Sequence, residues 1–214
     1  DKDSIGYSRE LWQQLVELGW ASIILPEAYD GLDFGFMGLG AIIEESGRTL
    51  TASPLFSTVV LSASALILGG NEQQKQENLP AIASGQLCIA LAVEESNHHK
   101  PQAITMAAEP TANGFILNGK KTFVLDGHCS DKLIVVARTA GEAGSTDGLS
   151  LFLVDANAEG IKLTRTSMVD SRNAANITFD KVKIAKSALI GELNHGFSIL
   201  DPVLDRGRIA MAAE

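Results

Sequence analysis

Apolar residues recur every three to four positions through the first 85 residues, which is the spacing of helices that bury one face. The clearest of these helices starts at Ser8, whose hydroxyl can cap the first turn, and ends at Gly19. Gly85 closes the last helix of this part. The pattern predicts helices over residues 8–18, 38–48, 54–68 and 71–83.

From Leu87 onward the pattern changes to short apolar and β-branched runs separated by Gly, Asn, Asp and Pro, which is typical of an antiparallel β domain. Asn118-Gly119 can supply the positive φ angles of a two-residue hairpin, so we expect a tight turn there between two strands. The number and spacing of the runs indicate a sandwich or small barrel. The predicted strands cover residues 87–93, 104–108, 115–118, 122–125, 133–137, 149–154, 161–164 and 175–179.

The fold class that follows is α+β, with an N-terminal helical domain over 1–85 and an antiparallel β-sandwich or barrel over 86–193. Residues 194–214 are expected to start a C-terminal helical domain. The Ala-rich helix in this last part reaches Glu214 without a cap, so we expect it to be truncated. Its apolar Ile209, Ala210 and Met211 are then expected to be exposed and to seek cover from another chain.

Composition narrows the range of partners. The 214 residues carry a formal charge of −9 with 6% aromatic residues and no basic run, which argues against nucleic acid or an anionic membrane as the main partner. The most apolar segment, residues 55–70, is shorter than the ~20 residues of a membrane-spanning helix. Cys88 and Cys129 have no disulfide or metal-site spacing and no export signal opens the chain, so a cytoplasmic location is expected.

Adjacent histidines, His98 and His99, are the residues most suggestive of a metal site. Neighbouring side chains point apart in an extended chain, and no third ligand is near in sequence, so no metal is predicted. The carboxylates are interpreted as a solvated surface, including Glu44 and Glu45 on a predicted helix.

Five phrases, in the same order and spread over the whole chain, resemble the acyl-CoA dehydrogenase family. The central phrase, LNGKKTFV at 117–124 with Gly127, His128 and Asp131 after it, looks like the strand pair that carries the family's flavin. The others are LGW at 18–20 with LPEAYDGL at 25–32, EESGR at 44–48, GNEQQK at 70–75 with LP at 79–80 and ASG at 83–85, and LDRGR at 204–208.

This resemblance implies an FAD-dependent oxidoreductase of fatty acid metabolism that removes two hydrogens across the α and β carbons of an acyl-CoA thioester. A carboxylate takes the α proton and the flavin accepts the β hydride. Phe123 and Val124 are equally compatible with ordinary core side chains. By position, the cofactor-binding residues implied are Ala92, Val93, Glu94, Phe123, Val124 and Leu125.

The chain departs from the family's pattern at the hydroxyl positions. Val93 stands where Thr is common, Leu125 stands where Ser or Thr is common, and residues 96–100 replace a Gly-Ser-Asp loop near the cofactor phosphates. Main-chain hydrogen bonds can survive these changes, whereas each lost hydroxyl bond to the flavin costs about 1 kcal/mol of affinity.

The resemblance also implies where the substrate and the base would be. Asp205 and Arg208 match positions that meet the CoA portion, although an ordinary helix-surface ion pair explains them equally well. One base position of the family is Gly207 here, so no catalytic residue is assigned in the chain, and the base is expected in a helical bundle beyond Glu214.

Two functions are compatible with these observations. In the first, the chain is part of an acyl-CoA dehydrogenase that is not competent alone, acts on acyl-CoA, passes electrons to an electron-transfer flavoprotein, and forms a homo- or hetero-oligomer when complete. In the second, it is a non-catalytic subunit of a heteromeric acyl-CoA dehydrogenase. VDSRNAA at 169–175 resembles the divergent small-subunit branch of the family and keeps the second hypothesis open.

Overall fold

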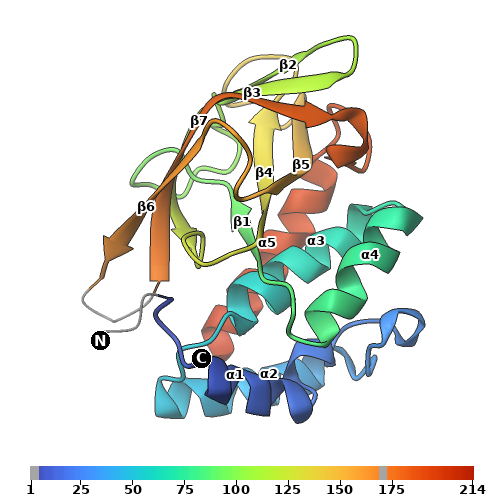
Figure 1. Ribbon diagram of the computed structural model, residues 1–214, viewed down its shortest axis with the longest axis vertical. Helices are drawn as coiled ribbons and strands as arrows, with labels where there is room; N and C mark the ends of the chain where they lie inside the picture. Colours follow the sequence, from blue (N-terminus) through green and yellow to red (C-terminus); the bar gives the residue numbers. More distant parts are fainter. Residues whose placement is uncertain (1–4, 169–172) are drawn as a thin grey trace. The chain divides into compact units, whose positions relative to one another are not determined.

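The computed structural model describes residues 5–168 and 173–214, which divide into two compact units (Figure 1). The first unit comprises Asp1–Cys88 with Asp201–Glu214 and is helical; the second comprises Ile89–Leu200 and is built around a sheet. The predicted α+β fold class is confirmed. None of the helices in the described ranges is long and apolar enough to cross a membrane.

The four helices predicted for the N-terminal part are all present in the first unit. The third of them begins as a π-helix and continues as α3. The elements are α1 (Arg9–Glu17), the 3-10 turns η1 (Trp20–Ser22) and η2 (Glu27–Tyr29), α2 (Gly35–Thr49), the π-helix η3 (Leu55–Ala63), α3 (Ser64–Gly69), α4 (Glu72–Ala83) and α5 (Phe197–Ala213), which enters this unit at Asp201.

Side-chain caps set the starts of two of these helices. The Ser8 hydroxyl accepts a hydrogen bond from the Leu11 N–H at 3.1 Å, as the sequence predicts. At α4, Asn71 and Gln74 form a reciprocal capping box, in which each side chain accepts the backbone N–H of the other residue. Two otherwise unpaired N–H groups are satisfied in this way, which stabilises the first turn.

The C-terminal helix packs within the helical unit along one face. Val203, Gly207 and Ala210 recur at the spacing of one helix face; Val203 and Ala210 are buried, and a Cβ added at Gly207 would lie 2.8 Å from the Leu61 side chain. The expectation that Ala210 is exposed is therefore wrong. The neighbouring Ile209 and Met211 are exposed, as expected, since they lie off this face.

The described strands of the second unit form one eight-stranded sheet in the order β6-β7-β3-β2-β4-β5-β8, with β1 paired to β4 (Figure 1). Most neighbouring strands are antiparallel, while β1 and β2 each run parallel to β4. The strands are β1 (Ile89–Ala92), β2 (Ala107–Pro110), β3 (Gly114–Leu125), β4 (Lys132–Arg138), β5 (Leu149–Asp155), β6 (Ile161–Ser167), β7 (Asn173–Ala185) and β8 (Leu189–Ile190).

The predicted hairpin at Asn118-Gly119 is wrong, because β3 runs through it without turning. Gly119 does adopt a positive φ of 145°, but it does so at a register shift against β7, where the Asn118 side chain accepts the Lys181 N–H at 2.8 Å. The turn that opens β3 lies earlier, where the Thr111 N–H donates to the Gly114 carbonyl. Asn-Gly thus lies at a register shift inside a strand, and this shift requires a positive φ just as a tight turn does.

Candidate functional site

The two segments that the sequence assigns to the cofactor lie side by side in the β unit. The first follows β1 and the second ends β3. The Thr122 N–H donates to the Glu94 carbonyl at 2.7 Å, and the Lys121 ammonium donates to the Val93 carbonyl at 2.9 Å. The fold therefore brings residues 92–94 and 123–125 together from positions about 30 residues apart.

A β-bulge presents Phe123 at the end of β3. Lys121 pairs with Ile177 and Val124 with Ala175, so Thr122 and Phe123 both stand opposite Asn176. Phe123 has a φ of 52°, and its N–H donates to the Asn176 side chain at 3.2 Å. Phe123 is 51% exposed, whereas Val124 is 1% exposed. Val124 is thus a core side chain and Phe123 is not.

Glu94 organises the loop that follows β1. Its carboxylate lies 2.6 Å from His99 Nδ1 and accepts the Lys100 N–H at 3.1 Å. The loop also contacts β3, since the Thr122 hydroxyl donates to the Ser96 carbonyl at 3.3 Å. Ala92 and Val93, in contrast, are buried. Glu94 is accordingly a structural acceptor within its own loop, with its main chain bound to β3.

Lys121 is the residue that sequence reasoning missed. Its side chain is fully buried and its ammonium lies 2.8 Å from a Glu95 carboxylate oxygen. Burial lowers the pKa of Lys121 to about 8, although the Glu95 charge acts in the opposite direction. The strand alternation could have identified it, because Lys121 shares the inward parity of Phe115 and Leu117.

Glu95 extends this contact to the start of β2. Its carboxylate accepts the Thr105 N–H at 2.8 Å, the Thr105 hydroxyl at 2.6 Å and the Met106 N–H at 3.0 Å. Partial burial alone would raise the pKa of Glu95, but the Lys121 charge and the bonds from Thr105 outweigh it, so the pKa is lowered. Both members of the pair are therefore ionised at neutral pH.

The lowered pKa of Lys121 predicts a pH dependence of stability. Between about pH 8 and its ordinary value of 10.5, the unfolded chain binds the Lys121 proton more tightly than the folded chain does, so stability rises with pH in this window. Relative to Lys121→Met, wild type should gain on the order of 1–3 kcal/mol between pH 7.5 and pH 10. Urea unfolding at both pH values measures this gain, and an equal change in the variant would contradict it.

Asp205 and Arg208 lie on α5 in the helical unit. Their side chains form an ion pair one turn apart and are both more than half exposed. Gly207, between them in sequence, faces Leu61. The geometry is that of a helix-surface pair, and it leaves both charges accessible to a ligand.

Two other sequence features do not form a site in the described residues. No group of three or more His, Cys, Asp or Glu side chains in the described ranges could hold a metal ion. Of the phrase at 169–175, residues 169–172 lie outside the described residues, and the remainder begins β7.

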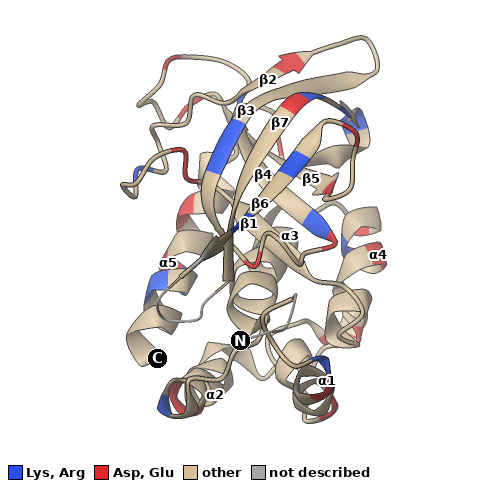
Figure 2. Ribbon diagram, turned by 60° about the vertical axis from the view of Figure 1, so that its left-hand side comes forward, with Lys and Arg blue, Asp and Glu red and all other residues tan. Residues whose placement is uncertain are grey.

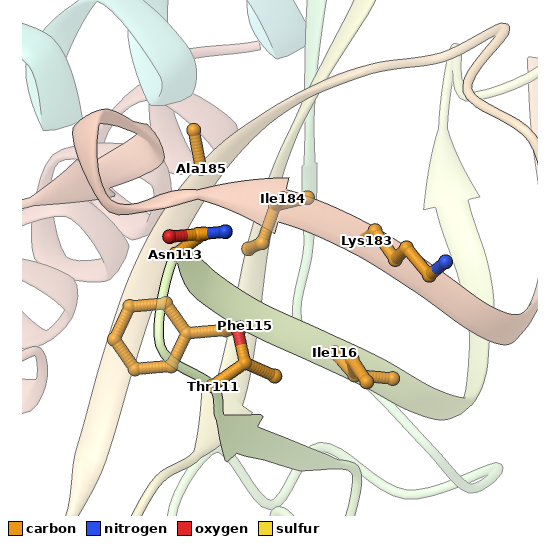
Figure 3. Close-up of a pocket in the computed structure, with 7 residues that line it drawn as sticks. All are labelled: Thr111, Asn113, Phe115, Ile116, Lys183, Ile184 and Ala185. Carbon is orange, nitrogen blue, oxygen red and sulfur yellow. The ribbon is translucent and has the colours of Figure 1, made fainter.

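A groove of about 430 Å³ lies at the other end of β3 (Figure 3). Phe115 in this groove and Phe123 in the candidate site are eight residues apart along an extended strand, or roughly 25 Å. The groove is therefore separate from the predicted cofactor contacts. Its lining residues are Thr111, Asn113, Phe115, Ile116, Lys183, Ile184 and Ala185.

The residues beside the bulge fit the apolar part of a flavin. An exposed aromatic ring next to buried aliphatic residues suits the face of a fused aromatic ring system. The side chains of Val93 and Leu125 offer no hydrogen bond, and the Thr122 hydroxyl already donates to Ser96. Polar contacts to the ring would therefore have to come from the main chain.

Charged residues are distributed over strands and helices of the part of the chain that the structure describes, instead of gathering on one element (Figure 2). Lys and Arg occur on β3, β6 and β7 and on the helices of the first unit. The site is consequently defined by its local contacts and not by a broad field of one sign.

Two family profiles match the chain. "Acyl-CoA dehydrogenase, N-terminal domain" matches residues 1–86, and "Acyl-CoA dehydrogenase, middle domain" matches residues 88–182. Among curated relatives, the mitochondrial isovaleryl-CoA dehydrogenase of Pongo abelii is 32% identical over 212 residues, covering 95% of this chain and 50% of that protein.

Two further proteins match the chain over nearly its whole length. The caffeyl-CoA reductase-Etf complex subunit CarC of Acetobacterium woodii is 26% identical over 219 residues, covering 100% of this chain and 58% of that protein. The structure of butyryl-CoA dehydrogenase from Megasphaera elsdenii superposes with a TM-score of 0.88 at 26% identity, covering 99% of this chain and 58% of that one. The chain thus spans about half the length of the relatives it matches.

Proposed function

The chain belongs to the acyl-CoA dehydrogenase family, and we propose that it supplies the helical and the flavin-contacting parts of an FAD-dependent oxidoreductase that acts on acyl-CoA thioesters. The observation that carries the proposal is the contact between the two predicted cofactor segments. The Val93 and Glu94 carbonyls accept hydrogen bonds from Lys121 and Thr122, the two residues that directly precede 123–125 on β3.

In this proposal, Phe123 offers its exposed ring to one face of the flavin while the main chain of residues 92–94 borders the ring. The buried side chains of Ala92, Val93 and Val124 exclude water behind these contacts. When bound, FAD supplies the acceptor for the hydride from the substrate's β carbon. We assign the α-proton base to none of the described residues.

Substrate and partners follow from the family by the same reasoning. Asp205 and Arg208 are proposed to meet the CoA portion, since both charges are accessible on α5. An electron-transfer flavoprotein is proposed as the acceptor, supported by the relative that is named as a subunit of an Etf complex. We further propose that the enzyme is oligomeric, belongs to fatty acid metabolism and is located in the cytoplasm. Its domain boundaries are proposed at residues 85 and 193.

A second candidate is a non-catalytic subunit of a heteromeric acyl-CoA dehydrogenase. The observation that favours it is the absence of hydroxyl side chains at Val93 and Leu125, together with Gly207 at one of the family's base positions. The two candidates differ in FAD binding, because the subunit hypothesis needs none.

FAD titration of the purified chain distinguishes the enzyme from the non-catalytic subunit. The same titration of Phe123→Ala tests whether Phe123 contacts the flavin. We expect visible flavin bands at about one FAD per chain. Loss of the exposed ring should weaken binding about fivefold, equivalent to about 1 kcal/mol of stacking. Stability should fall by about 1 kcal/mol, because about half of the residue is buried.

Phe34→Ala is the matched control, since Phe34 is an exposed phenylalanine in the helical unit. It should leave FAD affinity unchanged. If wild type binds no FAD at high micromolar concentration, the subunit hypothesis replaces the enzyme; equal binding by wild type and Phe123→Ala would remove Phe123 from the site.

A further inference from the structure

The buried ammonium of Lys121 links the two segments of the candidate site, residues 92–94 and residues 123–125. It donates to the Val93 carbonyl at 2.9 Å and to the Glu95 carboxylate at 2.8 Å, and no part of its side chain is exposed. Removing charges from water is costly, and replacing both members of a buried ion pair by aliphatic residues of similar volume is often neutral or stabilising. The contribution of this lysine is therefore more than the filling of space.

The ammonium fixes positions that an aliphatic side chain would leave free. Charge-assisted hydrogen bonds are directional, whereas dispersion contacts tolerate sliding. Through Val93 the ammonium fixes the chain that leaves β1. Through Glu95 it also fixes Thr105 and Met106, which lead into β2.

Both contacts lie directly beside the predicted flavin contacts. Val93 precedes Glu94, whose carbonyl accepts the Thr122 N–H. Lys121 itself precedes the bulge that presents Phe123. The ammonium thus fixes the chain directly beside Glu94 in the first segment and directly before Phe123 in the second.

Building on the proposed function, we propose that Lys121 is a positioning residue for the flavin, and that with Glu95 it sets the spacing between residues 92–94 and Phe123–Leu125. Lys121 touches neither substrate nor cofactor in this role. It acts through the main chain of the two segments, which must keep a fixed separation for a rigid ring to bind.

FAD affinity of Lys121→Met and of the double variant Glu95→Gln/Lys121→Met tests the proposal. The double variant removes both charges, so it keeps the fold even where the single variant is too unstable. We expect the dissociation constant for FAD to rise at least tenfold in both. The visible circular dichroism of the bound flavin should also change, which a loss of global stability alone would not cause. Lys120→Met, at the exposed neighbouring lysine, should bind within twofold of wild type.

Amide hydrogen exchange of the chain without FAD gives a second readout. Exchange at Thr105, Met106 and Thr122, whose N–H groups donate to Glu95 or Glu94, should accelerate in both Lys121 variants and stay unchanged in Lys120→Met. Unchanged exchange in the Lys121 variants, or wild-type FAD affinity in the folded double variant, would overturn the positioning role of Lys121. The proposed function of the chain would still stand. A wild-type chain that binds no FAD would overturn the proposed function and, with it, any role of Lys121 toward a flavin.

Discussion

Replacing Lys121 with alanine is expected to lower the free energy of unfolding by about 3–5 kcal/mol, the cost of breaking a buried ion pair by removing one partner. The substitution leaves the Glu95 carboxylate, which is 15% exposed, without its cation. It also removes the donor to the Val93 carbonyl and leaves a cavity in the sheet. Urea unfolding followed by circular dichroism measures the loss directly.

Lys120→Ala serves as the matched control, because Lys120 is exposed on the same strand and should change stability by less than about 0.5 kcal/mol. Adding Glu95→Gln to Lys121→Ala should recover part of the loss, since no uncompensated charge is then buried. A loss below about 1 kcal/mol in Lys121→Ala would mean that water reaches Glu95 and that the pair contributes little.

Replacing Arg138 with methionine should cost about 2–3 kcal/mol, because its guanidinium binds two loops together. Arg138 donates to the carbonyls of Ile104 and Gln102 in one loop, and of Ala140, Ser145 and Asp147 in the other. Its backbone N–H also binds the Met106 carbonyl, next to the groups that Glu95 holds. Chemical unfolding measures the loss, and limited proteolysis should show faster cleavage within residues 140–148.

Arg138→Lys distinguishes charge from geometry. Lysine keeps the positive charge but lacks the planar fork that reaches several carbonyls at once, so it should restore only a minor part of the stability. Full recovery with lysine would show that the charge alone matters. Unaltered proteolysis in Arg138→Met would show that the loops are held by other contacts.

Local patterns were sufficient where an element depends on its own residues. The helix capped by Ser8 forms where that residue predicts it, the helix predicted over 71–83 is present, and the apolar run at 133–137 is a buried strand. The prediction was wrong at Asn118-Gly119, because positive φ suits a turn and a strand irregularity equally well. Only the pairing partner, β7, decides between them.

The candidate site was predictable only in part, for a similar reason. The resemblance pointed to Phe123, but the pattern did not indicate whether its ring is buried, because a bulge changes the alternation of the strand. The ion pair between Lys121 and Glu95 joins residues 26 positions apart, and the chain has many carboxylates. Strand alternation places Lys121 inside, but only the register of the fold selects its partner.

The bulge at Thr122 and Phe123 has a consequence for how this strand can vary. The inward residues on either side, Lys121 and Val124, keep their places whether one residue or two stand opposite Asn176. One residue of the strand is thus surplus to the interior, and a substitution of the exposed Phe123 side chain alters what the surface recognises while the packed layer stays the same. Ligand preference could therefore be engineered at Phe123 without redesign of the core.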